Sequence, residues 1–230
     1  MRNRKQTNRG VSMIEFTLIV PFWCTLLLGT FWFGTAMVRG LMVNEVARDL
    51  DSMWSRGQDF SATGSSGENT MLTEITQSLG TVTSTGTGVV WFTQLTYVGN
   101  SVCAGLGTVA GKTYGTFTPT TQGYNPPCTN LGDFVITQQY YQGNYGLRKS
   151  AFGNATTSGM LDSTSEYNVM APTILNYSTT ASLVSNFNLL PKPAEAGADG
   201  YQSGNPIFVV EAYFQGVAGF QGGVYGYAVF

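Results

Sequence analysis

The stretch that decides the fold reads RGVSMIEFTLIVP and runs from Arg9 to Pro21. It opens an apolar segment in which no side chain from Phe16 to Val38 is charged. A membrane-spanning helix needs about 20 predominantly apolar residues, so this segment is long enough to cross a bilayer. The sequence therefore predicts a transmembrane helix over residues 11–38.

A single carboxylate, Glu15, lies near the start of this segment. A charged side chain at the centre of a membrane helix costs about 2.5–3.5 kcal/mol, less near the interface, and usually has a partner. If the chain is cut after Gly10, the new N-terminal amine of Val11 lies about one helical turn from Glu15. We therefore expect Gly10 and Val11 to flank a leader-peptide cleavage site and Glu15 to make a subunit contact in the membrane.

Further motifs follow the basic leader and its terminal glycine. They are Arg9-Gly10, Ile14-Glu15-Phe16-Thr17-Leu18 running into Pro21, Leu26-Leu27-Leu28-Gly29, Phe33-Gly34 and Asn44-Glu45-Val46-Ala47-Arg48. A basic leader ending in Gly, with Glu at the fifth position after the cut and Phe next, resembles the type IV prepilins. More narrowly, the chain resembles the TadE-like minor pilins of the tight-adherence (Tad) system. The resemblance covers about the first quarter of the chain, with a loose likeness again at residues 209–214.

The resemblance implies a structural role, as a minor pilin or pseudopilin-like subunit in the assembly, tip or adhesion of a Tad-type pilus. The implied partners are a prepilin peptidase, the major pilin and other minor pilins, the inner-membrane assembly platform and membrane lipid. One alternative stays open, namely a membrane-anchored extracytoplasmic adhesin or assembly adaptor that does not enter a fibre. A plain signal anchor explains the length and the positive leader equally well, but it gives no reason for Glu15 or Gly10.

The distribution of charge predicts the orientation of the chain. The residues before the apolar run include Arg2, Arg4, Lys5 and Arg9, whereas only Arg39 follows it closely. The positive-inside bias therefore predicts a single-pass inner-membrane protein with a cytoplasmic N-terminus and an extracytoplasmic C-terminal domain. Removal of the leader leaves seven basic side chains against 13 acidic ones, which argues against binding nucleic acid through a basic patch.

Apolar residues recur at steps of three and four beyond the membrane segment, which is typical of an amphipathic helix. They are Val43, Val46, Ala47, Leu50, Met53 and Trp54, with Arg48, Asp49 and Asp51 expected on other faces. We expect this apolar stripe to dock on the exported domain. The predicted elements of that domain are a short helix at 70–79, strands at 89–98, 133–141 and 206–215, and an edge strand from residue 223.

The predicted fold class is α+β, with a long membrane-spanning helix that continues into an amphipathic helix packed on a small antiparallel β-sheet domain with long loops. Alternating residues in the strand at 206–215 predict that it is half-buried, with Glu211 on the solvent side. The predicted divisions are a basic leader at 1–10, the transmembrane helix at 11–38, an amphipathic extension at 39–56, a Gly/Ser linker at 57–68 and an extracytoplasmic α+β domain at 69–230.

The sequence predicts no enzyme, no cofactor and no metal site. The chain has no histidine, which excludes Ser-His and Cys-His nucleophile pairs and imidazole ligands. The later carboxylates show no pairing, and we expect each to be solvated or to cap a helix: Glu68, Glu74, Asp133, Asp162, Glu166, Glu195, Asp199 and Glu211.

Two of the three cysteines are predicted to form a disulfide. Cys103 and Cys128 flank a Gly/Thr/Pro-rich stretch of the exported part, whereas Cys24 lies in the membrane run and is expected to stay free. A bridge that closes a loop of this length contributes about 3 kcal/mol, mainly by restricting the unfolded chain. A zinc site is not expected from two thiols with no histidine in the chain and no carboxylate between them.

Overall fold

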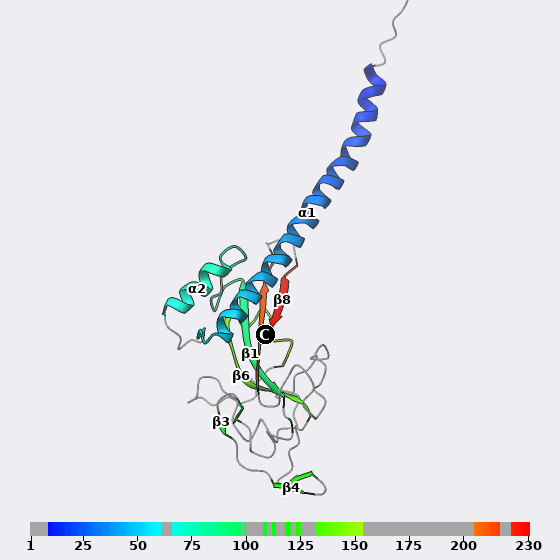
Figure 1. The fold of residues 1–230 in the computed structure, drawn as a ribbon. Coiled ribbons are helices and arrows are strands. Elements are labelled where there is room, and N and C mark those ends of the chain that lie inside the picture. The colour runs from blue at the N-terminus through cyan, green and yellow to red at the C-terminus, as the bar shows by residue number, and fades with distance from the viewer. Residues whose placement is uncertain are drawn as a thin grey trace, which may run out of the picture.

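The computed structural model of the protein describes residues 9–60, 66–97, 99, 108–109, 112–113, 118–120, 123–125, 132–153, 205–216 and 222–230. A single long helix, α1 (Arg9–Ser55), extends away from a head that contains a β-sheet (Figure 1). Pro21 lies inside α1 without ending it. The C-terminal part of α1 packs on the sheet, and its N-terminal part projects from the head (Figure 1).

The sheet has four strands in the order β6-β1-β7-β8. These strands are β1 (Gly88–Tyr97), β6 (Phe134–Gly143), β7 (Pro206–Phe214) and β8 (Val224–Val229). Each strand pairs antiparallel with its neighbours, and the β1–β6 register shifts between Gln94 and Leu95. The α+β fold class and the antiparallel sheet are therefore confirmed, with each predicted strand within two residues of its observed bounds.

Four short strands lie in the region of the chain between β1 and β6. They form two separate hairpin ladders, β2 (Thr108–Val109) with β3 (Lys112–Thr113), and β4 (Thr118–Thr120) with β5 (Gly123–Asn125). The sequence reading had placed no regular structure in this Gly/Thr/Pro-rich stretch. Strands of two or three residues carry too few alternating side chains to be recognised by periodicity.

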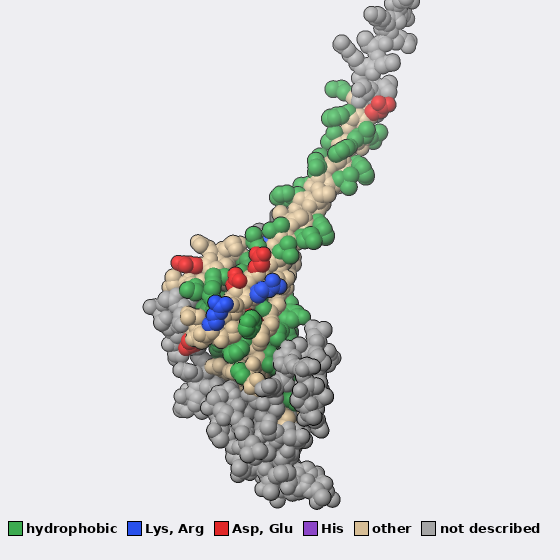
Figure 2. Space-filling view, in the orientation of Figure 1, with side chains coloured by type: hydrophobic (Ala, Val, Ile, Leu, Met, Phe, Trp, Pro, Cys, Tyr) green, Lys and Arg blue, Asp and Glu red, His purple; other side chains and the backbone are tan. Residues whose placement is uncertain are grey.

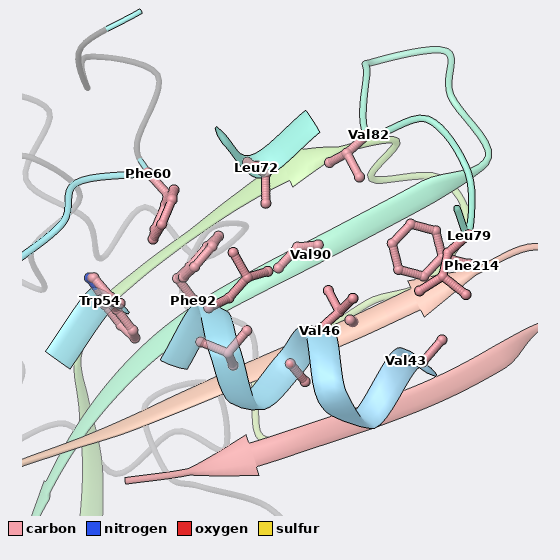
Figure 3. Packing of buried hydrophobic residues seen from close by; sticks show 14 of the residues in the cluster. Val43, Val46, Trp54, Phe60, Leu72, Leu79, Val82, Val90, Phe92 and Phe214 are labelled. Atoms are coloured by element: carbon pink, nitrogen blue, oxygen red, sulfur yellow. The ribbon is translucent and has the colours of Figure 1, made fainter. Parts of the chain in front are cut away.

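The main core lies between α1 and one face of the sheet. Val43, Ala47 and Leu50 of α1 are completely buried there. Figure 3 shows Val43 and Val46 of the helix among the side chains of this core. The Trp54 ring makes edge contacts with Phe92 and Phe208, at centroid distances of 5.5 and 5.0 Å. These contacts place an aromatic group near the end of α1, where the helix leaves the sheet.

Helix α2 (Ser66–Thr76) begins four residues before the predicted start of 70 and ends three residues before the predicted end of 79. Its first residues therefore fall in the range that the sequence assigned to a linker. Leu72 and Leu79 join the main core, one from α2 and one from the turn that follows it. The apolar spacing that suggested a helix to residue 79 is thus satisfied by a helix and a turn.

The prediction that the strand at 206–215 is half-buried was wrong. β7 is an inner strand, with β1 on one side and β8 on the other. Val209 and Glu211, which alternate with the helix-facing residues, are 0 % and 2 % exposed. Part of the cover over this second face comes from residues 144–153, which make hydrogen bonds to Trp91, Gln139 and Glu211. Alternation in β7 therefore separates two buried faces.

Gly143 ends β6 where this covering segment begins. Its φ of 102° lies in the left-handed region that favours glycine. A Cβ at this position would approach the Gly88 carbonyl oxygen to 2.3 Å. The next residue, Asn144, donates its backbone N–H to that oxygen at 3.0 Å. The close approach of these two backbones turns the chain back over the sheet.

Candidate membrane and subunit-contact segment

The N-terminal part of α1 carries most of the exposed apolar surface of the described residues. Leu18, Leu28 and Phe33 are 74 %, 69 % and 72 % exposed, and hydrophobic side chains lie along the projecting helix on the face shown in Figure 2. The most apolar window of α1 has no buried residue, unlike the core helix of a soluble domain. By length and composition, α1 is the one helix in the described part of the chain that could cross a membrane.

The four threonines of this segment make hydrogen bonds inside the helix. The hydroxyl groups of Thr17 and Thr25 donate to the carbonyl oxygens of Met13 and Phe22, each at 2.8 Å. Thr30 and Thr35 donate in the same way to carbonyl oxygens three residues earlier, each at 3.0 Å. A donor without a partner costs several kcal/mol in hydrocarbon, so this arrangement makes the threonines compatible with lipid.

Glu15 differs from these threonines. Its side chain is exposed on α1, and no hydrogen bond or ion pair is shown for it within the described residues. Gly10 and Val11 belong to the first turns of α1, and residues 1–8 of the predicted leader lie outside the described residues. The structure thus brings Gly10, Val11 and Glu15 onto one helix, as the sequence suggests. Cleavage and a contact of Glu15 with another subunit stay predictions.

Arg39 lies between the projecting part of α1 and the part that packs on the head. Its Nη2 donates to the carbonyl oxygen of Leu79 at 3.2 Å and to that of Gln215 at 3.3 Å. The first of these follows α2 and the second follows β7. Sequence reasoning treated Arg39 only as a charge that helps to set orientation. In the structure it also ties α1 to two other elements of the head.

Asp51 does not lie where the sequence placed it. It was expected on a face away from the apolar stripe, but its side chain is 1 % exposed. Neither carboxylate oxygen has a hydrogen-bond partner in the structure as described. Burial without a partner raises the pKa of Asp51 from 3.8 to about 7. Burial therefore makes the protonated form of Asp51 more favourable than it is for an exposed aspartate.

Glu211 was expected to be solvated or capping, and this expectation was also wrong. Its carboxylate accepts hydrogen bonds from the Ala151 backbone N–H and the Tyr225 hydroxyl, each at 2.8 Å, and from the Ser150 hydroxyl. Burial raises the pKa of Glu211, and the three donors and the Arg148 charge oppose that rise. The Arg148 guanidinium lies 3.9 Å from the centre of the Tyr225 ring. These residues fasten the 144–153 segment to β7 and β8.

Sequence reasoning missed the Glu211 cluster, because its members come from three separate places in the chain. Residues 148–151 follow β6, Glu211 is in β7, and Tyr225 is in β8. One clue was available. Glu211 interrupts the apolar run from Ile207 to Phe214, and a carboxylate in such a run requires donors once both sides of the strand are covered.

The cysteine predictions concern residues both inside and outside the described ranges. Cys24 is an exposed free thiol on α1. Cys103 and Cys128 lie outside the described residues, so their disulfide stays a prediction. Asp162, Glu166, Glu195 and Asp199 lie outside them too. Within the described ranges, no group of three His, Cys, Asp or Glu residues could hold a metal ion.

Comparison with known families gives one match. Residues 10–50 match the family model described as TadE-like protein. This range contains Gly10, Val11, Glu15 and Arg39, and it ends inside the part of α1 that packs on the sheet. No curated protein and no solved structure matches the chain. The predicted resemblance of the N-terminal segment to TadE-like proteins is thereby confirmed.

Proposed function

We propose that this chain, TadE-like over residues 10–50, is a minor-pilin-like structural subunit of a Tad-type pilus. One observation carries the proposal. The residues that match the family model lie on α1, and the apolar N-terminal half of this helix packs on no other described element. A helix of this kind is suited to lie in lipid before assembly and against other apolar helices afterwards. The role is structural and involves no catalysis.

The same helix explains how the subunit is held and oriented. The predicted leader carries four basic side chains, the last of them Arg9. These charges keep the N-terminus in the cytoplasm, and the sheet domain is exported. A prepilin peptidase then cuts between Gly10 and Val11. The major pilin and other minor pilins receive the apolar part of α1, and the inner-membrane assembly platform brings the subunits together.

Glu15 has a specific part in this proposal. An exposed carboxylate on a helix in lipid is unfavourable, and a nearby amine relieves that cost. The amine of Val11 becomes available only after the cut, one turn from Glu15 in the same chain or in a neighbouring subunit. The pairing would make correct packing depend on processing, and it would favour one axial register between helices.

N-terminal sequencing of the protein from sheared fibres and from membranes tests the proposal. We expect Val11 as the first residue of fibre-associated protein. The variant Gly10→Val places a branched side chain at the cut and should leave uncut protein in the membrane fraction only. Fibre-associated protein that retains Met1 would contradict the assigned cut. Protein that is uncut and confined to membranes in wild-type cells would instead support the alternative of a membrane-anchored adhesin or adaptor.

A further inference from the structure

β8 forms one edge of the sheet, and half of its backbone groups point away from β7. Phe208 and Phe230 exchange two backbone hydrogen bonds, of 3.1 and 2.9 Å. In an antiparallel pair, hydrogen-bonded and non-hydrogen-bonded positions alternate. Tyr225, Tyr227 and Val229 take the non-hydrogen-bonded positions opposite Tyr213, Glu211 and Val209. Their N–H and C=O groups therefore point outward from the sheet, and no backbone hydrogen bond from them is found in the structure as described.

This edge lacks the features by which proteins usually block strand addition. Such features include charged side chains, proline, a bulge or a very short strand. The sequence of β8 is VYGYAV, with no charge and no proline, and its register with β7 is continuous over six residue pairs. Tyr227 is 40 % exposed beside this edge. Within the described residues, no strand pairs with the outer side of β8, so this edge can accept another extended segment.

α1 lies over β8 and runs in the same direction. Near the start of β8, Gly226 is so close to α1 that a Cβ there would be 2.5 Å from Asn44 Oδ1. Further along α1, Trp54 packs on Phe208, whose backbone pairs with Phe230 just beyond the end of β8. The edge therefore lies beside the helix that anchors the chain.

This shared direction argues against pairing of β8 with β8 of a second copy. The strands of this sheet all pair antiparallel, and antiparallel pairing of two β8 edges would point the two α1 helices in opposite directions. Two chains inserted in one membrane with the same orientation cannot adopt that arrangement. An antiparallel strand beside β8 would therefore have to come from a segment other than β8 of a second copy.

We propose that the β8 edge accepts an extended, uncharged segment of a different membrane-anchored pilus subunit, which adds antiparallel to β8 as a fifth strand. Main-chain hydrogen bonds provide the affinity in strand addition, and alternate side chains provide the specificity. Tyr227 and Val229 flank the new strand on the face away from α1, so apolar or aromatic residues are favoured opposite them. The inference rests on the proposed pilus role, which supplies a partner held in the same membrane.

Photocrosslinking in piliated cells tests this inference. Tyr227 is replaced by the photoreactive analogue p-benzoylphenylalanine in the full-length chain, and the adducts are mapped by mass spectrometry. We expect one major adduct, on an uncharged extended segment of another pilus subunit. Val229→Pro removes an outward N–H without removing a hydrogen bond to β7, and it should lower the adduct yield about tenfold. Val229→Ala, which keeps that N–H, should retain most of the yield.

Val229→Lys provides a second test that keeps the backbone intact and places a charge at the edge. It should also lower the adduct yield, while protease resistance of the head reports that each variant is folded. An adduct only with lipid or with a second copy of this chain would overturn the inference, as would an unchanged yield in folded Val229→Pro. Wild-type protein present in fibres without an adduct overturns strand addition alone. An adduct with protein that never enters fibres overturns the fibre role alone.

Discussion

Leu27 and Leu50 lie on the same continuous helix, yet Leu27 is 62 % exposed and Leu50 is fully buried. The first belongs to the apolar segment that projects from the head, and the second packs between α1 and the sheet. Helical propensity is the same for both residues, so their different surroundings come from tertiary packing. One part of α1 packs in the core of the head, and the other exposes apolar side chains and could cross a membrane by its length and composition.

The two carboxylates Glu15 and Asp51 repeat this contrast. Glu15 is exposed on the projecting part, whereas Asp51 is buried on the packed part without a hydrogen-bond partner in the described structure. No hydrogen bond or ion pair is shown for Glu15 within the described residues, and we propose that its partner is the amine of Val11 or a group of another chain. For Asp51, burial raises the pKa and so favours the protonated form. Of these two residues, we propose a subunit contact only for the exposed Glu15, and the buried Asp51 is expected to affect folding.

The largest expected effect on folding comes from Leu50→Ala. Removing a fully buried leucine side chain costs about 2–5 kcal/mol, because the apolar contacts are lost and a cavity remains. Leu27→Ala is the matched control and should leave the stability of the head unchanged. Thermal and denaturant unfolding of the full chain in detergent measures both. Equal losses in the two variants would mean that the two parts of α1 do not differ as described.

Asp51 should make the stability of the head depend on pH. Its folded pKa of about 7 lies above the ordinary value of 3.8, so between these values the folded state keeps a proton that the unfolded state releases. The free energy of unfolding should therefore fall as the pH rises through this interval, by up to about 1.4 kcal/mol per pH unit, and level off above pH 7.

Asp51→Asn removes the ionisable group and should reduce this pH dependence. The variant should gain most relative to wild type near pH 8 and least near pH 4. Glu211 retains its own raised pKa and contributes a residual slope of the same sign, because burial also favours its protonated form. Denaturant unfolding at several pH values compares the two proteins. Identical pH profiles would show that Asp51 is charged and partnered in the folded chain.

Arg39 lies at the junction of the two parts of α1, and its replacement should have a smaller effect. Arg39→Gln weakens the hydrogen bonds to the Leu79 and Gln215 carbonyl oxygens, at a cost of about 1–2 kcal/mol. Arg56→Gln changes an exposed arginine near the other end of the packed part and is the control. Thermal unfolding in detergent checks both variants. If Arg39→Gln lowers the thermal stability no more than Arg56→Gln does, the hydrogen bonds of Arg39 do not stabilise the junction.

Local patterns predicted the elements of this fold better than they predicted its burial. Local sequence patterns indicate the apolar length of α1, the stripe through Val43 and Leu50, and the strands rich in β-branched residues. The positions of Asp51 and Glu211 depend on what covers a helix face or a strand. That cover comes from residues distant in sequence, such as Ser150 and Tyr225 over Glu211. A single sequence read by periodicity does not contain this information.

The same reasoning explains which site residues the sequence could indicate. Gly10, Val11 and Glu15 lie close together in the chain, so a motif and a helical turn relate them without tertiary knowledge. The two carbonyl partners of Arg39 are 40 and 176 residues away. Backbone carbonyls have no sequence signature, and the role of Arg39 in joining α1 to the head therefore emerged only from the structure.

The smallest expected effect on the folding of the single chain belongs to Glu15→Ala, and it gives the sharpest test of the contrast within α1. Glu15 is exposed and far from the packed part, so the unfolding of the head should not change. Membrane insertion should be unharmed or improved, because an ionisable group leaves the apolar segment. Incorporation into fibres should nevertheless fall, since the Val11 amine loses its carboxylate.

Glu45→Ala, which removes an exposed carboxylate from the packed part, should leave incorporation unchanged. Fibre yield and subunit content, with each variant as the sole copy, measure the outcome. Wild-type piliation by Glu15→Ala would leave the apolar surface of α1 as the assembly determinant and remove Glu15 from that role.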